Sequence, residues 1–320
     1  MLRAAYRGRV GTRLLFSTSA VFHYLGPSFA VLLFSAVPVL GVAWLRIASA
    51  AAVYAGWRRP WRVLPAMARA DVVLLFALAA VFAFMNACFY IAISQVPLAT
   101  VGAIEFLAPI GLAVYGLRTR RNGMALCIAI IGVFLLSAVR FAGQPVGLFF
   151  AFANCAFFGT YVVLGHRIAQ SGASTGVDRL GMAMIFAVPF ITPLGFEGAS
   201  TAFFVPLLLG AGIAVGVCSS VIPYAIDQVT MSRLPRASFA LLLCMLPATA
   251  AVIGFVVLRQ APTPLDLTGI GLVMMGIGIH QERGATEQDP GPRKGVGVGA
   301  APPLRAPTQG AEAERPGVRG

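Results

Sequence analysis

The sequence predicts an all-α polytopic membrane protein with ten transmembrane helices, arranged as two five-helix repeats of inverted topology. Of its 320 residues, 58% are hydrophobic and only 11% are charged, a balance that excludes a soluble globular domain. One apolar segment occurs twice in the chain, and the arginines gather in alternate loops between apolar runs. The composition gives the class of protein, and the other two observations predict the repeat and its orientation.

The repeated segment covers residues 94–116, SQVPLATVGAIEFLAPIGLAVYG, and residues 232–254, SRLPRASFALLLCMLPATAAVIG. The two copies align without a gap at an offset of 138 residues. Identical positions include Ser94/Ser232, Pro97/Pro235, Ala99/Ala237, Pro109/Pro247, Ala113/Ala251, Val114/Val252 and Gly116/Gly254. Because proline lacks a backbone N–H and bends a helix, a mid-span proline in both copies predicts a repeated bend.

The turn at the start of each copy differs in charge. Residues 95–98 carry no charge, whereas the matching turn carries Arg233 and Arg236. Arginine in short loops marks the cytoplasmic side of a membrane, so the two turns are expected on opposite sides. An odd number of helices in each half produces this inversion.

The first repeat is predicted over residues 14–142, after a cytoplasmic N-terminus, residues 1–13, that carries four arginines. The apolar run that follows is too long for the h-region of a signal peptide, so we expect it to be the first spanning helix. The loop after the second helix is basic and rich in turn residues. Trp57 and Trp61 lie at its start, a position typical of aromatic residues at the membrane interface. The five helices are predicted at residues 14–34, 39–55, 72–93, 99–117 and 124–139.

The second repeat is predicted over residues 143–280. Its helices are expected at residues 146–164, 180–194, 204–231, 237–258 and 267–280, the second of them short and containing Pro189 and Pro193. Residues 281–320 are rich in Pro, Gly, Ala and mixed charge, without an apolar run. This composition predicts a disordered cytoplasmic tail, with a dispensable extension favoured over a regulatory module.

The distribution of arginine tests this scheme independently of hydropathy. The N-terminus and the four loops assigned to the inside carry fifteen arginines, whereas the five outside loops carry only Arg140 and Arg259. The positive-inside rule therefore places both termini in the cytoplasm. The same distribution explains the net charge of +13 without a basic groove, so the expected partner is the lipid bilayer and not nucleic acid.

Motifs for metal, cofactor or catalytic chemistry are not found in the sequence. The five cysteines lie singly in apolar segments, without a CxxC or Cys/His spacing. The GxG at residues 269–271 lacks the strand–turn–helix context of a dinucleotide site. Ser219, Ser220 and Asp227 are too few for an intramembrane enzyme, so neither an enzyme nor a cofactor is predicted.

Three charged residues lie inside predicted spans: Arg46 in the second helix, Glu105 in the fourth and Asp227 in the eighth. A charge in hydrocarbon costs about 2.5 to 3.5 kcal/mol or more, so these are the first candidates for function. Burial favours the neutral form of a carboxylate and lets it exchange a proton with the bulk. The alternative is a buried ion pair that only locks helices together.

Five further polar or amphipathic residues lie in predicted helices and are candidates for a hydrophilic path: His23, Asn86, Asn154, Tyr161 and Tyr224. Each is equally compatible with an ordinary interhelical hydrogen bond, and for any single one that interpretation is slightly favoured.

Two consecutive motifs, NACFYIAISQVPLATVGAIEFLAP and IPYAIDQVTMSRLPRASFALLLCMLPATAAVIG, resemble the EamA-type members of the drug/metabolite transporter superfamily. Within it, the chain is most similar to the bacterial threonine/homoserine exporter group, over residues 14–280. The resemblance implies a ten-helix carrier of the bacterial inner membrane with a central cavity. It also implies export of small amphiphilic metabolites by proton exchange.

The resemblance also implies roles for particular residues. The family's helix-two arginine, helix-three asparagine, helix-four glutamate, helix-six tyrosine and helix-eight acidic residue match Arg46, Asn86, Glu105, Tyr161 and Asp227. The family usually has a glutamate immediately before the helix-nine proline, where this sequence has Leu246. This difference puts any mechanism that needs two facing glutamates in doubt.

The expected function is therefore secondary export of a small polar metabolite, with a neutral amino acid such as threonine or homoserine favoured. Arg46 is expected to face the substrate carboxylate, and Glu105 its ammonium group or the coupling proton. The alternatives are a drug or other metabolite exporter of the same fold and a membrane scaffold without transport activity. The substrate, the coupling ion and the oligomeric state, including a homodimer, stay open.

Overall fold

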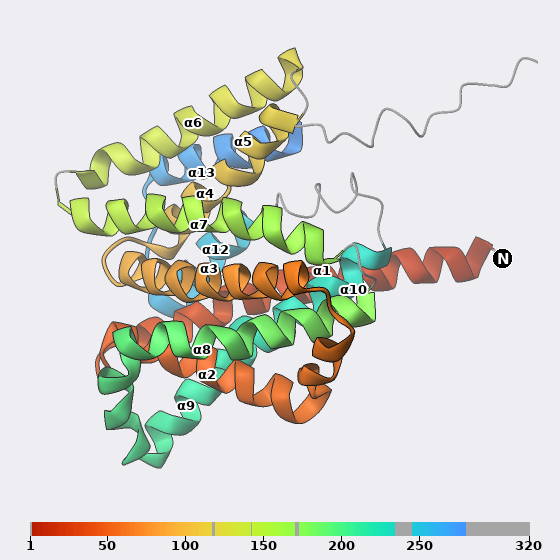
Figure 1. Ribbon diagram of the computed structural model, residues 1–320. Coiled ribbons are helices and arrows are strands. Elements are labelled where there is room, and N and C mark those ends of the chain that lie inside the picture. Colours follow the sequence, from red (N-terminus) through yellow and green to blue (C-terminus); the bar gives the residue numbers. More distant parts are fainter. Residues whose placement is uncertain (1, 117–118, 142, 170–172, 234–244, 280–320) are drawn as a thin grey trace, which may run out of the picture. The chain divides into compact units, whose positions relative to one another are not determined.

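The computed structural model describes residues 2–116, 119–141, 143–169, 173–233 and 245–279, which all lie in one compact unit, Met1–Ala285. Every regular element in these ranges is a helix (Figure 1). Six helical segments are long and apolar enough to cross a membrane, and four more are apolar but shorter. The chain is thus a multi-pass membrane protein that is helical throughout its described elements. The tail expected at residues 281–320 lies outside the described residues.

The helices of the first half begin with α1, which differs from the prediction at its start. The helix predicted from residue 14 begins at Leu2, since Arg and Ala among the basic residues 2–13 are good helix formers. A short 3₁₀-helix, η1, occupies the basic loop after α2. The elements are α1 Leu2–Leu33, α2 Val39–Arg58, η1 Pro60–Ala66, α3 Arg69–Ile93, α4 Leu98–Glu105, α5 Leu107–Gly116 and α6 Arg120–Phe141.

The helices of the second half include one that is much longer than expected. The short helix predicted at residues 180–194 is 31 residues long, with Pro189 and Pro193 in its interior. The single helix predicted at residues 204–231 is interrupted by a π-helical turn, η2. The elements are α7 Pro145–Ala169, α8 Ala173–Phe203, α9 Pro206–Gly216, η2 Val217–Val221, α10 Ile222–Arg233, α12 Met245–Leu258 and α13 Pro264–Ile279.

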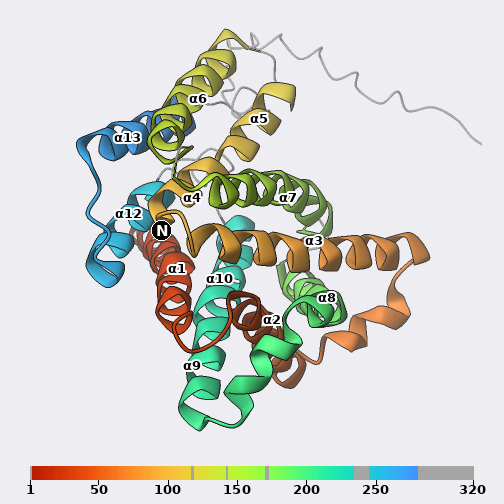
Figure 2. The same cartoon turned by 90° about the vertical axis from the view of Figure 1, so that its left-hand side faces the viewer.

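The helices pack in pairs that join the two halves of the chain. In both views α3 lies between α7 and α8, and α6 lies beside α13 (Figure 1, Figure 2). The other main pairs are α2 with α8, α1 with α10 and α12, and α4 with α7 and α12. The pairs centred on α1, α2, α3 and α4 bring the predicted site residues toward one another.

Salt bridges join three helices at the end of the fold that contains the basic loop. Arg58 Nε lies 2.7 Å from Asp178 Oδ1, and Arg179 Nη2 lies 3.7 Å from Asp71 Oδ2. Trp57 at this end has an exposed side chain, as expected for an interfacial aromatic residue. Arg58 and Arg179 thus also join helices, because their salt bridges link α2 and α3 to α8.

Glycine permits the close contact between α2 and α8. A methyl group added at Gly41 would lie 2.5 Å from the carbonyl carbon of Gly198 and 2.7 Å from the backbone nitrogen of Ala199. In the same helix, a methyl group at Gly56 would have open space around it.

We therefore expect alanine substitutions at these two positions of α2 to have opposite effects. Gly56→Ala raises stability by up to about 1 kcal/mol through helix propensity. Gly41→Ala lowers it by about 1 to 3 kcal/mol through overpacking against α8. Thermal unfolding of the purified variants in detergent measures both, and equal stability of the two variants would contradict the described packing.

Candidate functional site

Arg46 is buried in α2, with 5% of its surface exposed. Its Nε donates to Ser220 Oγ at 2.9 Å, and its Nη2 donates to the carbonyl oxygen of Ser219 at 3.1 Å. Its guanidinium carbon lies 5.5 Å from the centre of the Tyr90 ring, close enough for a cation–π contact. These contacts hold the guanidinium between α3 and the π-helical turn.

The π-helical turn η2 provides both serine contacts, and a proline explains why one of them is a backbone carbonyl. Pro223 has no N–H, so the carbonyl oxygen of Ser219 lacks the α-helical donor four residues later. Arg46 Nη2 donates to this carbonyl oxygen in its place. π-Helical turns of this kind are frequent at functional sites because they redirect backbone groups away from the helix axis.

Glu105 lies where α4 ends and α5 begins, with 7% of its surface exposed. A proline four residues later explains this break, as a proline does for the carbonyl oxygen of Ser219. Pro109 has no N–H to donate to the carbonyl oxygen of Glu105, which instead receives a weak contact from Cys155 Sγ at 3.8 Å. The carboxylate oxygen Oε1 accepts a hydrogen bond from Asn154 Nδ2 at 3.4 Å. The bend predicted for the first repeat copy is therefore present, and it carries the buried acid.

Arg46 and Glu105 do not form the buried ion pair that was the alternative interpretation. Within the described ranges, no carboxylate lies within salt-bridge distance of the guanidinium, although Arg46 and Glu105 lie within electrostatic range of each other. Tyr224 lies within electrostatic range of both of them and of Asp227. All three predicted charges thus lie within electrostatic range of one tyrosine, and no ion pair among them is found in the described ranges.

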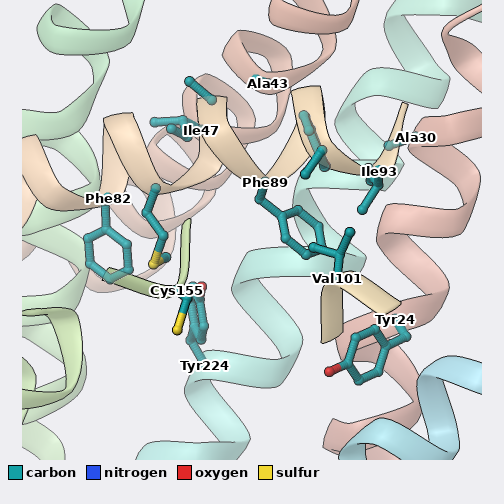
Figure 3. Packing of buried hydrophobic residues seen from close by; sticks show 14 of the residues in the cluster. Tyr24, Ala30, Ala43, Ile47, Phe82, Phe89, Ile93, Val101, Cys155 and Tyr224 are labelled. Carbon is teal, nitrogen blue, oxygen red and sulfur yellow. The ribbon is translucent and has the colours of Figure 1, made fainter. Parts of the chain in front are cut away.

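Aromatic rings form a cluster around Tyr224. Ring centroids are 5.8 Å apart for Phe82 and Tyr224, 5.2 Å for Phe82 and Tyr161, and 6.2 Å for Tyr161 and Tyr224. Figure 3 shows Phe82 of α3 and Tyr224 of α10 within the buried cluster. His23 extends this cluster to α1, with its ring 5.9 Å from that of Tyr224. Two predicted site residues, Tyr161 and His23, therefore lie beside the charged ones.

Asp227 lies in α10, where it meets α1. Ser19 Oγ donates to Asp227 Oδ1 at 2.6 Å and also lies 3.3 Å from the carbonyl oxygen of Pro223. In α1, Pro27 leaves the carbonyl oxygen of His23 without its helical donor, as Pro109 and Pro223 do in their helices. Asp227 thus has a polar partner of its own, separate from Arg46.

Asn86 and Leu246 are placed differently from the other predicted positions. Asn86 is buried in α3, and its Nδ2 donates to the carbonyl oxygen of Phe82 in the same helix at 2.8 Å. This hydrogen bond lies within α3, so it joins Asn86 neither to another helix nor to another side chain of the site. Leu246 is buried near the start of α12, where it packs in the hydrophobic core.

Several polar residues of the site were not among the sequence candidates. They are Ser19, Tyr24, Tyr90, Cys155 and, as ligands of Arg46, Ser219 and Ser220. Four buried atoms of the site have no hydrogen-bond partner among the described residues: Tyr24 Oη, Tyr90 Oη, Asn154 Oδ1 and Ser219 Oγ. One sequence signal points to three site segments, since His23, Glu105 and Ser219 each lie four residues before a proline.

An open cavity of about 810 Å³ lies at the ends of α2, α3 and α8, apart from these residues. Its lining includes Ser94, Gln95 and Glu197 and no charged residue of the site. The loops that contribute to it are those predicted to lie outside, which carry few arginines.

Comparison with known proteins agrees with a membrane exporter. No family model matches the chain. It is 29% identical to the threonine/homoserine exporter RhtA of Escherichia coli strain K12 over 255 residues, or 78% of this chain and 84% of that protein. It is also 29% identical to RhtA of Salmonella typhimurium strain LT2 over 267 residues, or 82% and 86% of the two chains.

A protein of known crystal structure has the same fold, with a TM-score of 0.54 and 18% identity over 85% of this chain and 97% of the other. The similarity to threonine/homoserine exporters that the motifs suggested is thus confirmed over about four fifths of the sequence. The chain is a multi-pass helical membrane protein similar to bacterial exporters.

Proposed function

We propose that the chain is a secondary transporter of the EamA type in the drug/metabolite transporter superfamily, which exports a small polar metabolite across the bacterial inner membrane. Threonine and homoserine, named for the similar exporters, are the first substrates to test. One observation carries the proposal. A buried arginine of α2 and a buried glutamate of α4 lie within electrostatic range of each other but form no direct ion pair in the described ranges.

Such an arrangement lowers the stability of the protein, so we expect it to serve a function. A buried charge without a paired counter-charge is destabilising by about 2.5 to 3.5 kcal/mol or more, so a structural role alone accounts poorly for it. In the proposed cycle, Arg46 faces the carboxylate of the substrate, and Glu105 faces its ammonium group or carries the coupling proton. Proline-interrupted helices on both sides of the site give it backbone that can rearrange as access alternates.

The pairing of the helices supports the proposed inverted repeat. If helices are matched between halves by the predicted order, α3 with α7 corresponds to α10 with α1. When the two halves are exchanged, each of three pairs maps onto itself: α2 with α8, α6 with α13, and α4 with α12. This is the contact pattern that a two-fold exchange of the halves generates, as in transporters of alternating access.

The proposed orientation, with both termini in the cytoplasm, predicts the sidedness of the two repeat turns. Single cysteines at Gln95 and Arg233 in a cysteine-free variant should react with an impermeant maleimide from opposite faces of the membrane, since the arginine-bearing turn is inside. Labelling in intact cells and in inside-out vesicles measures this. Reaction of both positions from the same face would contradict the inversion.

Export of labelled L-threonine or L-homoserine from preloaded cells that overproduce the chain tests the function itself. The proposal expects faster efflux than in cells without the protein. Efflux of aromatic or cationic drugs instead would favour a drug exporter, for which the aromatic rings of Phe82, Tyr161 and Tyr224 are suited. A scaffold without transport predicts no efflux of any compound and tolerance of substitutions at Arg46 and Glu105.

A further inference from the structure

Two of the buried hydroxyl groups without a hydrogen-bond partner lie together at Arg46. Ser219 and Tyr90 each have 0% of their surface exposed, and neither Ser219 Oγ nor Tyr90 Oη has a partner among the described residues. A buried polar group left unpaired costs about 1 to 3 kcal/mol, which makes two of them beside one cation unusual.

The contacts of the π-helical turn position these groups. Ser219 offers its carbonyl oxygen to Arg46, so its side chain is held on the same turn of backbone. The Tyr90 ring lies against the guanidinium, and its hydroxyl lies near Ser219 and Arg46 without reaching hydrogen-bond geometry. Gly26 of α1 packs directly against Ser219: the Ser219 hydroxyl oxygen is the atom nearest to the position of an added methyl group, and the Ser219 backbone nitrogen lies 2.7 Å from that position.

Each of the three groups has a donor that can serve a ligand. The guanidinium keeps N–H groups beyond the two that bind Ser220 and Ser219, and each hydroxyl can rotate its hydrogen toward an acceptor. A carboxylate offers two oxygens with about four acceptor positions, and its charge matches the unpaired cation. An amide or alcohol of the same shape offers less acceptor strength and no charge.

We propose that Ser219 and Tyr90 complete, with Arg46, a binding site for the carboxylate of the transported molecule. This inference rests on the proposed function, because it assigns the anion to the substrate. Asn154 Oδ1, an unpaired acceptor beside Glu105, suits an ammonium group at the other end. The substrate class is then a small zwitterionic amino acid.

The test compares Ser219→Ala and Tyr90→Phe with the matched control Ser137→Ala. Ser137 of α6 is also buried, with a hydroxyl that has no hydrogen-bond partner in the described part of the chain, but it makes no contact with Arg46 in that part. Tyr90→Phe keeps the ring against the guanidinium and removes only the hydroxyl. For export of L-threonine, each test variant should raise the half-saturating concentration roughly tenfold, while the control leaves it unchanged.

A second readout requires no transport. Thermal stabilisation of the purified proteins is measured with L-threonine, L-threoninamide and sodium chloride. The site predicts stabilisation by L-threonine only, reduced in both test variants at equal ligand concentration and kept in Ser137→Ala. If this holds while no export occurs, the site stands and the proposed function fails. If export occurs with unchanged half-saturation in the test variants, the site is refuted and the function stands.

The remaining outcomes also decide the question. Stabilisation by chloride alone, by the acid and its amide alike, or by none of the three compounds overturns the carboxylate site. Because Ser219 lies in a closely packed turn, Ser219→Ala can lower the folded yield, and Tyr90→Phe then decides by itself.

Discussion

Replacing Glu105 with glutamine is expected to abolish accumulation of substrate driven by a pH gradient while leaving exchange across the bilayer intact. Glutamine has the same size and keeps an acceptor for Asn154, which donates to Glu105 at 3.4 Å. It cannot take up or release a proton, so coupling of substrate exit to proton entry is lost. One pH unit stores about 1.4 kcal/mol per proton, so a one-for-one exchanger loses roughly tenfold accumulation per unit.

The measurement uses everted vesicles with an imposed pH gradient, acidic on the side that corresponds to the cell exterior. Glu197→Gln is the matched control, because Glu197 is an exposed carboxylate at the open cavity and not at the site. The control should accumulate substrate as the wild type does. Full gradient-driven transport by Glu105→Gln would rule out the coupling role and direct attention to Asp227.

Replacing Arg46 with glutamine is expected to remove both exchange and accumulation. Arg46 is the buried cation proposed to bind the substrate carboxylate, and its guanidinium makes two hydrogen bonds to the π-helical turn. Loss of one partner of a buried, hydrogen-bonded charge pair costs about 2 to 5 kcal/mol, roughly 30-fold or more in substrate affinity. Arg62→Gln, on the exposed side of η1, is the control and should leave transport unchanged.

The double variant Arg46→Gln with Glu105→Gln distinguishes the site from a structural ion pair. A structural pair predicts low folded yield for each single change and recovery in the double variant. Since the two side chains form no direct pair in the described ranges, we expect no recovery of transport. Recovery of both yield and transport in the double variant would contradict the proposed roles of Arg46 and Glu105.

Much of the helical organisation could be predicted from the sequence, because long apolar runs separated by arginine-bearing turns allow few alternatives. The errors arose where local signals were ambiguous. Pro189 and Pro193 suggested a short helix, yet α8 continues through both because its neighbours pack tightly along it. The basic N-terminal residues continue α1, since charge does not end a helix.

The site was predicted only in part. Charged residues stand out in an apolar segment of the sequence, whereas uncharged polar residues are common there and do not. Arg46 and Glu105 were found by their charge, whereas Tyr90 reads as an ordinary aromatic residue in an apolar run. The partner of a long side chain depends on tertiary packing, which residue spacing does not give. The spacing of four residues between Ser219 and Pro223 was a usable signal, since it frees a carbonyl as Glu105 and Pro109 do.

The most direct test of the account is counterflow of labelled amino acids in proteoliposomes that contain the purified protein. The account predicts that internal L-threonine or L-homoserine drives uptake of the labelled compound by the wild type and by Glu105→Gln, but not by Arg46→Gln. No counterflow by the wild type with either compound, or equal counterflow by Arg46→Gln, would contradict an amino-acid exporter that uses this site.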